Sequence, residues 1–145
     1  MRSSPKSVVT ESEETHSSVY VDTSAIARML LDEPDKPAIE QRLEDFEERV
    51  ASRLLRVELR RVGAREGVLD RADDLLKDIS LVAMDEETLA SAETLTPSTV
   101  TTLDAIHLAT AVRLSRAGEL DALMTYDKRL ADGARAHGIT VLSPS

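Results

Sequence analysis

Short apolar runs alternate with amphipathic stretches along the chain from Val19 onward. The runs predict buried β-strands, and the stretches, whose apolar residues recur every three or four positions, predict helices. The expected strands are 19–21, 49–51, 79–84, 122–125 and 139–142. The expected helices are 25–31, 38–48, 53–65, 69–78, 85–95, 103–116 and 127–137. This alternation predicts an α/β fold, a three-layer α/β/α sandwich with a mostly parallel sheet.

The first 18 residues differ in composition from the rest of the chain. Residues 1–18 are rich in Ser, Thr and Glu and lack apolar periodicity, so we expect a disordered N-terminal tail. Residues 19–145 show no internal repeat and no change of composition. A stretch of this length suits a single domain with one core.

Composition narrows the classes of function. The net charge is −9, which argues against a protein that coats nucleic acid through a basic surface. Tyr20, Phe46 and Tyr126 are the whole aromatic set, too few for a base-stacking platform. Cysteine is absent, which excludes disulfides and thiolate metal sites. No apolar run is long enough to span a bilayer, so we expect a cytoplasmic protein with no membrane contact.

Glu58 lies where a buried apolar residue is expected. With Leu54 at zero on a helical wheel, Glu58 falls near about 40°, between Leu54 and Val62 at about 80°. A buried carboxylate is costly unless it is paired or binds a metal. The structural alternative is that Glu58 pairs with Arg61 or Arg65; we favour a functional role because acids with perturbed pKa values gather at functional sites.

Three aspartates indicate a site only when their positions are considered together. Asp22 and Asp127 each follow a predicted strand, where either is explained equally well as a helix N-cap. Asp104 lies in the first turn of an apolar helix, where an acid also favours the helix dipole. Parallel α/β sheets bind ligands at the carboxyl ends of their strands. All three aspartates, with Glu58, are therefore expected to meet at that edge.

Four converging carboxylates repel one another unless a cation neutralises them. Oxygen ligands without cysteine or a histidine cluster favour Mg²⁺ or Mn²⁺. Ser24 is a candidate to orient Asp22 or a bound water, and Thr125 is a candidate hydroxyl neighbour of Asp127. His107 lies one turn after Asp104, and we interpret it first as a structural residue that donates to a nearby carbonyl or carboxylate.

The same residues carry a family resemblance. The run 19–25, VYVDTSA, resembles the opening motif of PIN domains, and Glu58 within RVEL resembles their second acidic position. The run 103–111, LDAIHLATA, resembles the third motif and is the most specific match. The run 125–130, TYDKRL, resembles the last. The four acids are separated by 36, 46 and 23 residues, an order and spacing that also fit.

A single-domain chain of this size looks most like a VapC-type toxin of a toxin–antitoxin pair. The resemblance implies a five-stranded parallel sheet and Mg²⁺- or Mn²⁺-dependent endonucleolytic cleavage of RNA by activated water. It implies that the catalytic and metal-binding residues are Asp22, Glu58, Asp104 and Asp127. It also implies a homodimer and inhibition by a cognate antitoxin.

Other functions remain open at this point. A PIN nuclease of RNA processing, outside a toxin–antitoxin system, has the same motifs. A degenerate PIN-like module for protein interaction would keep the fold, although all four acids are present. A response-regulator receiver or an Asp-x-Asp phosphatase also places acids at strand ends. Both need a second acid near the first, whereas Asp22 is followed by Thr23 and Ser24.

Overall fold

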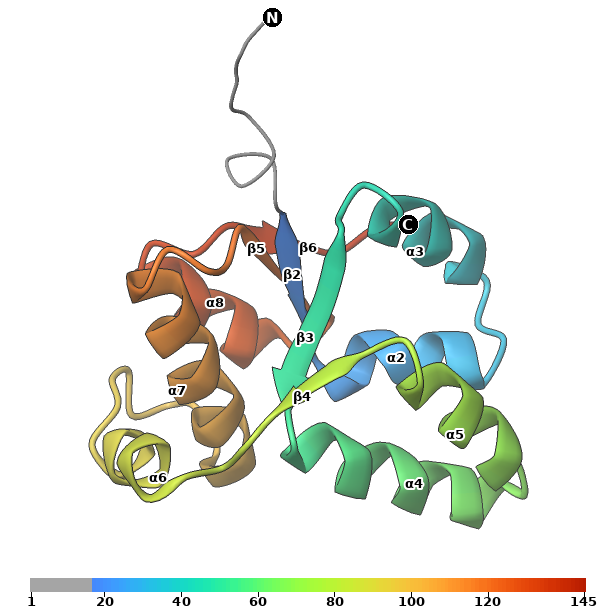
Figure 1. Ribbon diagram of the computed structural model, residues 1–145, viewed down its shortest axis with the longest axis horizontal. Coiled ribbons are helices and arrows are strands. Elements are labelled where there is room, and N and C mark those ends of the chain that lie inside the picture. Colours follow the sequence, from blue (N-terminus) through green and yellow to red (C-terminus); the bar gives the residue numbers. More distant parts are fainter. Residues whose placement is uncertain (1–16) are drawn as a thin grey trace, which may run out of the picture.

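Five parallel strands form one sheet in the computed structural model, which describes residues 17–145 (Figure 1). The order across the sheet is β4-β3-β2-β5-β6. The strands are β2 (Ser18–Val21), β3 (Glu48–Ser52), β4 (Ser80–Val82), β5 (Ala122–Met124) and β6 (Val141–Leu142). All four neighbouring pairs are parallel, which confirms the predicted α/β class and the five-stranded parallel sheet.

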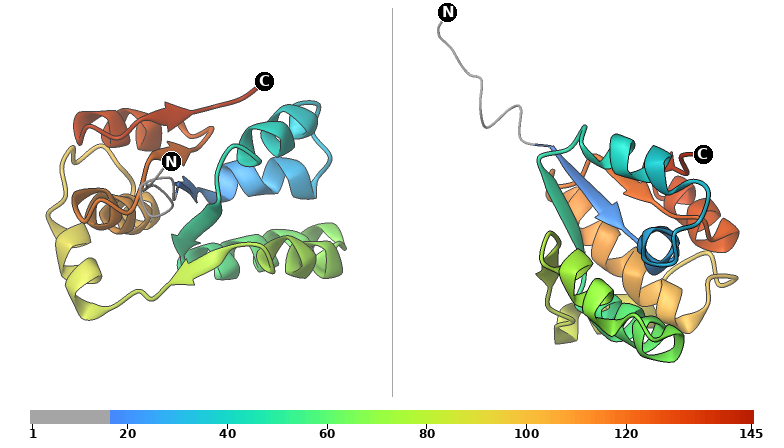
Figure 2. Two further views of the ribbon diagram at one scale, coloured as in Figure 1. Left: turned by 45° about the horizontal axis from the view of Figure 1, so that its top comes forward. Right: turned by 90° about the vertical axis from the view of Figure 1, so that its right-hand side faces the viewer.

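Helices flank this sheet on two sides (Figures 1 and 2). On one side lie the helices that connect β2 to β3 and β3 to β4, and on the other lie α6, α7 and α8. The first group is α2 (Thr23–Leu30), α3 (Lys36–Leu43), α4 (Leu54–Glu66) and α5 (Leu69–Leu76). The second is α6 (Glu86–Glu93), α7 (Thr102–Arg116) and α8 (Lys128–Ala136). Two helical layers around a sheet are the predicted sandwich.

The strand order reverses at β2. From β2 the chain moves outward through β3 to β4, and then returns to the other side of β2 for β5 and β6. Parallel crossovers are nearly always right-handed, so this reversal places the two sets of helices on opposite faces. The crevice at such a switch point, outside the carboxyl ends of β2 and β5, is where α/β sheets bind ligands.

The centre of the sheet is the centre of the core. Every residue of β2 is buried, as expected for a strand covered on both faces. Leu55 and Leu59 of α4 and Leu108 of α7 are fully buried against the same cluster. Tyr20 is also fully buried, and its hydroxyl is the polar group of β2 that the core must satisfy.

The predicted helix 38–48 is wrong at both ends. The helix α3 starts at Lys36, because Pro37 falls in its first turn, where a missing N–H costs nothing. It ends at Leu43, and Glu48 already belongs to β3. The amides of Glu47 and Glu48 both donate to the Ser17 carbonyl at 3.0 Å, so pairing with β2 replaces the helical bonds.

Other boundaries differ by a few residues. The edge strands β4 and β6 are shorter than predicted, because a strand end with one neighbour has fewer bonds to define it. Ser18, expected in the tail, opens β2, and its amide donates to Asp121 Oδ2 at 2.9 Å. Ser17 of the predicted tail is also described, and residues 1–16 lie outside the described residues. Within residues 17–145, no helix is long and apolar enough to cross a membrane.

Gly63 marks the closest approach of α4 to α5, and its substitution tests this packing. A Cβ at Gly63 would lie 3.0 Å from Ala72 Cβ, 3.2 Å from Leu69 Cα and 3.3 Å from the Val68 carbonyl oxygen. Two of these atoms are backbone and cannot move aside easily. Gly63→Ala is therefore expected to lower the free energy of unfolding by about 1–2 kcal/mol, despite alanine's helix propensity. Urea denaturation measures this, and a stabilised variant would contradict the packing.

Candidate active site

Asp22 directly follows β2 and opens α2 as its N-cap. Its side chain is almost completely buried, and every hydrogen bond that it accepts goes to Oδ2. The Ser24 hydroxyl donates at 2.7 Å, the Thr125 hydroxyl at 2.8 Å and the Ser24 amide at 3.3 Å. Ser24, expected beside Asp22, and Thr125, expected beside Asp127, therefore both hold Oδ2 of Asp22 and leave Oδ1 without a hydrogen bond.

The end of β5 is tied to the end of β2 through the same hydroxyls. The amide of Tyr126 donates to Ser24 Oγ at 2.8 Å, and the amide of Asp127 donates to Thr125 Oγ1 at 3.0 Å. Asp127 is the N-cap of α8, where its Oδ1 accepts the amide of Leu130 at 2.8 Å. The predicted capping role of Asp127 is thus present, at a position beside the Asp22 network.

Glu58 reaches the same edge from α4. It does not take the alternative arrangement with Arg61 or Arg65; its Oε1 accepts from Thr23 Oγ1 at 2.5 Å and from His107 Nε2 at 2.7 Å. Burial alone would raise the pKa of Glu58, but these two hydrogen bonds outweigh it and lower that pKa. Glu58 is therefore held as a carboxylate, with Oε2 left free.

His107 lies fully buried in α7 between Glu58 and Tyr20. Its Nδ1 is 2.7 Å from the Tyr20 hydroxyl, and its Nε2 is 3.9 Å from Asp22 Oδ1. Burial would lower the pKa of His107, but the hydrogen bond to Glu58 and the nearby carboxylates raise it above the usual value. The expected structural contact with a carboxylate is present, and that carboxylate is itself a candidate site residue.

Asp104 lies in the first turn of α7, half-buried. Burial, then the charge of Asp127 and then that of Asp22, raise the pKa of Asp104 to about 6. The charges of Asp127 and Asp22 thus act on Asp104, and burial is the larger cause of the raised pKa. Ionisation of Asp104 therefore costs free energy, because its carboxylate is partly desolvated and is repelled by the charges of Asp127 and Asp22.

The donor chemistry suits a hard divalent cation. Asp22 Oδ1 and Glu58 Oε2 accept no hydrogen bond. Among the described residues, Asp35 Oδ1 is the one side-chain polar atom that is both buried and without a partner. The two free oxygens of Asp22 and Glu58 are therefore open to water. As they are arranged within residues 17–145, no three acidic or histidine side chains already surround a common point. An ion held here would retain water ligands, as Mg²⁺ commonly does.

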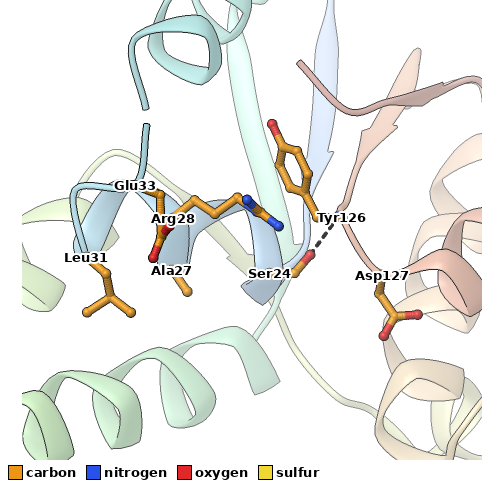
Figure 3. A pocket seen from close by; sticks show the side chains of 7 residues that line it. All are labelled: Ser24, Ala27, Arg28, Leu31, Glu33, Tyr126 and Asp127. Carbon is orange, nitrogen blue, oxygen red and sulfur yellow. Dashed lines mark hydrogen bonds between the residues drawn. The ribbon is translucent and has the colours of Figure 1, made fainter. Parts of the chain in front are cut away.

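A pocket of about 410 Å³ adjoins the acidic edge (Figure 3). Ser24 and Asp127 line it together with Arg28 and Tyr126. Arg28 extends from α2 towards Tyr126, with its guanidinium carbon 4.1 Å from the ring centroid, and also pairs with Asp35 at 2.9 Å. The pocket thus places one guanidinium and one aromatic ring beside Asp127, with Glu33 in the same lining.

Two contributors were absent from the residues predicted for the site. Thr23 donates to Glu58, and Tyr20 contacts His107 from the centre of the sheet. Nothing in the sequence distinguishes Thr23 as a site residue apart from its position next to Asp22, because hydroxyl residues are common at the start of a helix. Tyr20 did give a signal, since a hydroxyl in an otherwise aliphatic buried strand requires a partner.

Residues 19–136 match the PIN domain, and the chain belongs to this family. It is 40% identical over 133 residues to "Ribonuclease VapC47" of Mycobacterium tuberculosis (strain CDC 1551 / Oshkosh), covering 87% of this chain and 96% of that protein. It is 38% identical over 129 residues to "Ribonuclease VapC46" of M. tuberculosis (strain ATCC 25618 / H37Rv), covering 88% and 98%.

Solved structures share the fold at low identity. A toxin–antitoxin complex from Klebsiella pneumoniae matches with a TM-score of 0.68 and 19% identity, over 88% of this chain and 98% of that one. VapBC2 from Rickettsia felis, bound to a DNA fragment from its promoter, matches with a TM-score of 0.67 and 13% identity, over 88% and 99%. These matches confirm the α/β architecture of the PIN domain.

The raised pKa of Asp104 predicts a pH-dependent loss of stability in metal-free protein. Between pH 4 and pH 6 the folded state binds the proton that the unfolded state releases, so stability falls as pH rises. Asp104→Asn removes this charge. The variant should therefore be more stable than the wild type at pH 7.5, but only slightly, because solvent screens the half-exposed carboxylate. We expect an increase in Tm of about 2–4 °C at pH 7.5 and none at pH 4. Calorimetry with EDTA at both values tests this; equal effects at both would contradict it.

Proposed function

We propose that the protein is a divalent-metal-dependent endoribonuclease, the VapC-type toxin of a toxin–antitoxin pair. The observation that carries the proposal is the hydrogen-bond network at the switch point of the sheet: Thr125 links Asp22 to the amide of Asp127, and His107, bonded to Glu58, lies 3.9 Å from Asp22 Oδ1. The relatives at 40% and 38% identity are named ribonucleases, which supports the same reaction class for this chain.

The four acids have different roles in this proposal. Asp22 and Asp104 would hold Mg²⁺ or Mn²⁺ directly, because Asp22 has a free oxygen and Asp104 lies beside two other carboxylates. Asp127 would contribute from its N-cap position. Glu58 would orient the attacking water or bind the ion through water. When bound, the cation supplies Lewis-acid activation of water and neutralises charge at the scissile phosphate.

RNA must approach a protein of net charge −9. The bound cation would supply the local positive charge. Arg28 and Tyr126 line the pocket beside Asp127, where a base can stack on the ring or the guanidinium plane. Lys128 is largely exposed at the start of α8, next to Asp127, and is placed to meet a phosphate.

An acidic edge also suits inhibition by a basic peptide. We propose a cognate antitoxin that places an arginine among the carboxylates, using bidentate pairing in place of the cation. The two structural relatives are described as a toxin–antitoxin complex and as VapBC2, which supports such a partner. A homodimer in the cytoplasm is part of the same proposal. Co-expression with the product of the adjacent gene, followed by affinity purification, tests the antitoxin; no complex would count against it.

Cleavage of cellular RNA is the direct test of the nuclease. Purified protein, free of any antitoxin, should cut total RNA at discrete positions in Mg²⁺ or Mn²⁺, and mapping of the 5′ ends identifies the target. EDTA and Asp104→Asn should each reduce cleavage by at least about a hundredfold, because both remove charge stabilisation at the phosphate. Ser18→Ala, at the opposite end of β2, serves as a control for handling and stability.

Three outcomes distinguish the alternatives. Cleavage that survives both EDTA and Asp104→Asn would contradict the site. No cleavage by folded protein that binds Mn²⁺ would favour a nuclease restricted to one structured RNA, and no Mn²⁺ binding would favour an interaction module. Activity without a toxic effect in cells would favour a role in RNA processing.

Cation binding should release protons near pH 6. Asp104 is about half-protonated there, and a cation favours its carboxylate form. Calorimetric titration with Mn²⁺ in two buffers of different ionisation enthalpy should show release of about half a proton at pH 6 from this group. The part of the proton release that Asp104→Asn removes should be smaller at pH 8 than at pH 6. Identical release by wild type and Asp104→Asn at pH 6 would place the cation away from Asp104.

A further inference from the structure

A chain of buried hydrogen bonds connects the middle of the sheet to Glu58. The backbone amide of Ser52 in β3 lies 2.9 Å from the Tyr20 hydroxyl, and that hydroxyl lies 2.7 Å from Nδ1 of His107. Nε2 of His107 lies 2.7 Å from Glu58 Oε1, which also accepts from Thr23. Four elements of the sandwich therefore determine where one candidate site carboxylate lies.

The direction of these bonds follows from the groups themselves. The Ser52 amide can only donate, so it occupies a lone pair of the Tyr20 oxygen. Burial raises the pKa of Tyr20 well above its usual value, so the phenol keeps its hydrogen. We assign that hydrogen to the bond with Nδ1 of His107, since Thr110, the other side chain at the Tyr20 hydroxyl, donates its own hydrogen to the Ile106 carbonyl. In a neutral imidazole the other nitrogen, Nε2, then carries the proton and donates to Glu58.

We propose that Tyr20 and His107 are positioning residues for Glu58. The Tyr20 hydroxyl at Nδ1 and the Glu58 carboxylate at Nε2 together favour the Nε2–H tautomer of His107, and His107 with Thr23 fixes Oε1 of Glu58. Oε2 is thereby turned to the site. The inference rests on the proposed nuclease function for its consequence in catalysis, but the tautomer is a property of the metal-free protein.

A purely structural account of these residues is weaker. Tyr20 and His107 are both fully buried, and polar groups in such a core are costly unless they are satisfied. Aliphatic residues of similar volume would fill the same space without that cost. The chain of bonds ends instead on Glu58, whose side chain is 22% exposed at the acidic edge. A glutamate there would otherwise lose its fixed geometry, since its side chain has three rotatable bonds.

The tautomer can be measured by NMR without any metal or RNA. Long-range ¹H–¹⁵N spectra of the full chain, at a pH where the ring is neutral, should show His107 protonated at Nε2 and unprotonated at Nδ1. His107→Gln identifies its signals among the three histidines. Tyr20→Phe should shift the ¹⁵N resonance of Nδ1, which loses its donor, while Glu58 keeps the proton on Nε2. A wild-type ring protonated at Nδ1, or doubly protonated over the whole folded range, would overturn the inference.

Kinetics test the positioning role. Tyr20→Phe should lower kcat by about tenfold with KM changed less than twofold, as outer-sphere partners of a site commonly do. Thr23→Val, at the partly exposed end of the network, should lower kcat in the same way, and Thr23→Ser should restore it. Thr23→Val provides the test if Tyr20→Phe does not fold. The substrate is the RNA fragment mapped with the wild-type protein.

Ser18→Ala is the matched control, because Ser18 is a buried residue of β2 that loses one hydrogen bond, to the Glu119 carbonyl, away from the site. Losses of activity by Tyr20→Phe or Thr23→Val that only follow the folded fraction, as in Ser18→Ala, would overturn positioning. So would full activity of both variants. An inactive wild type would contradict the proposed nuclease instead, and the NMR result would still decide the tautomer.

Discussion

Repulsion among carboxylates is the constraint on which the rest of this structure depends. Burial of Asp104, followed by the charges of Asp127 and Asp22, raises its pKa to about 6. A fold that holds such a cluster loses stability for it, and the buried core of β2 and its neighbours offsets that loss. In the proposed function this cost has a chemical use, because a divalent cation bound at the edge would reduce the repulsion.

The protein controls the cluster by holding one oxygen of a carboxylate and leaving the other free. Oδ2 of Asp22 accepts all of that side chain's hydrogen bonds, and Oε1 of Glu58 accepts both of its own. Preorganised oxygens of this kind bind a cation or water without reorganising at the moment of reaction. The hydroxyls of Ser24 and Thr125 also join the ends of β2 and β5, so the switch point is closed by the site's own network.

The surface charges near this edge are mostly paired within the protein. Arg28 pairs with Asp35, and Lys128 lies 3.5 Å from Asp132. The exposed Lys128–Asp132 pair contributes little stability and can open at small cost, whereas the Asp35 side chain is largely buried. An acidic protein with paired basic residues attracts RNA weakly at long range, and a selective nuclease has a reason to avoid non-specific binding.

The sequence by itself determined the class of fold and the main candidate residues. Alternation of apolar runs with helical periodicity depends on local geometry alone, and strand ends in a parallel sheet share an edge by topology, so the α/β class and the grouping of Asp22 with Asp127 could be predicted. The end of the predicted helix 38–48 could not, because strand pairing with Ser17 competes with helical bonds there.

Only the tertiary structure decided how the site is held. Tyr20 and His107 are 87 residues apart, and Thr23 and Glu58 are 35 apart, so no periodicity connects them. Glu58 was identified as an unusual carboxylate from its helical face, but its partners turned out to be His107 and Thr23 and not an arginine of its own helix. A hydrogen bond requires its donor–acceptor distance to be correct within a few tenths of an ångström, and groups on separate elements reach such distances only after the helices pack on the sheet.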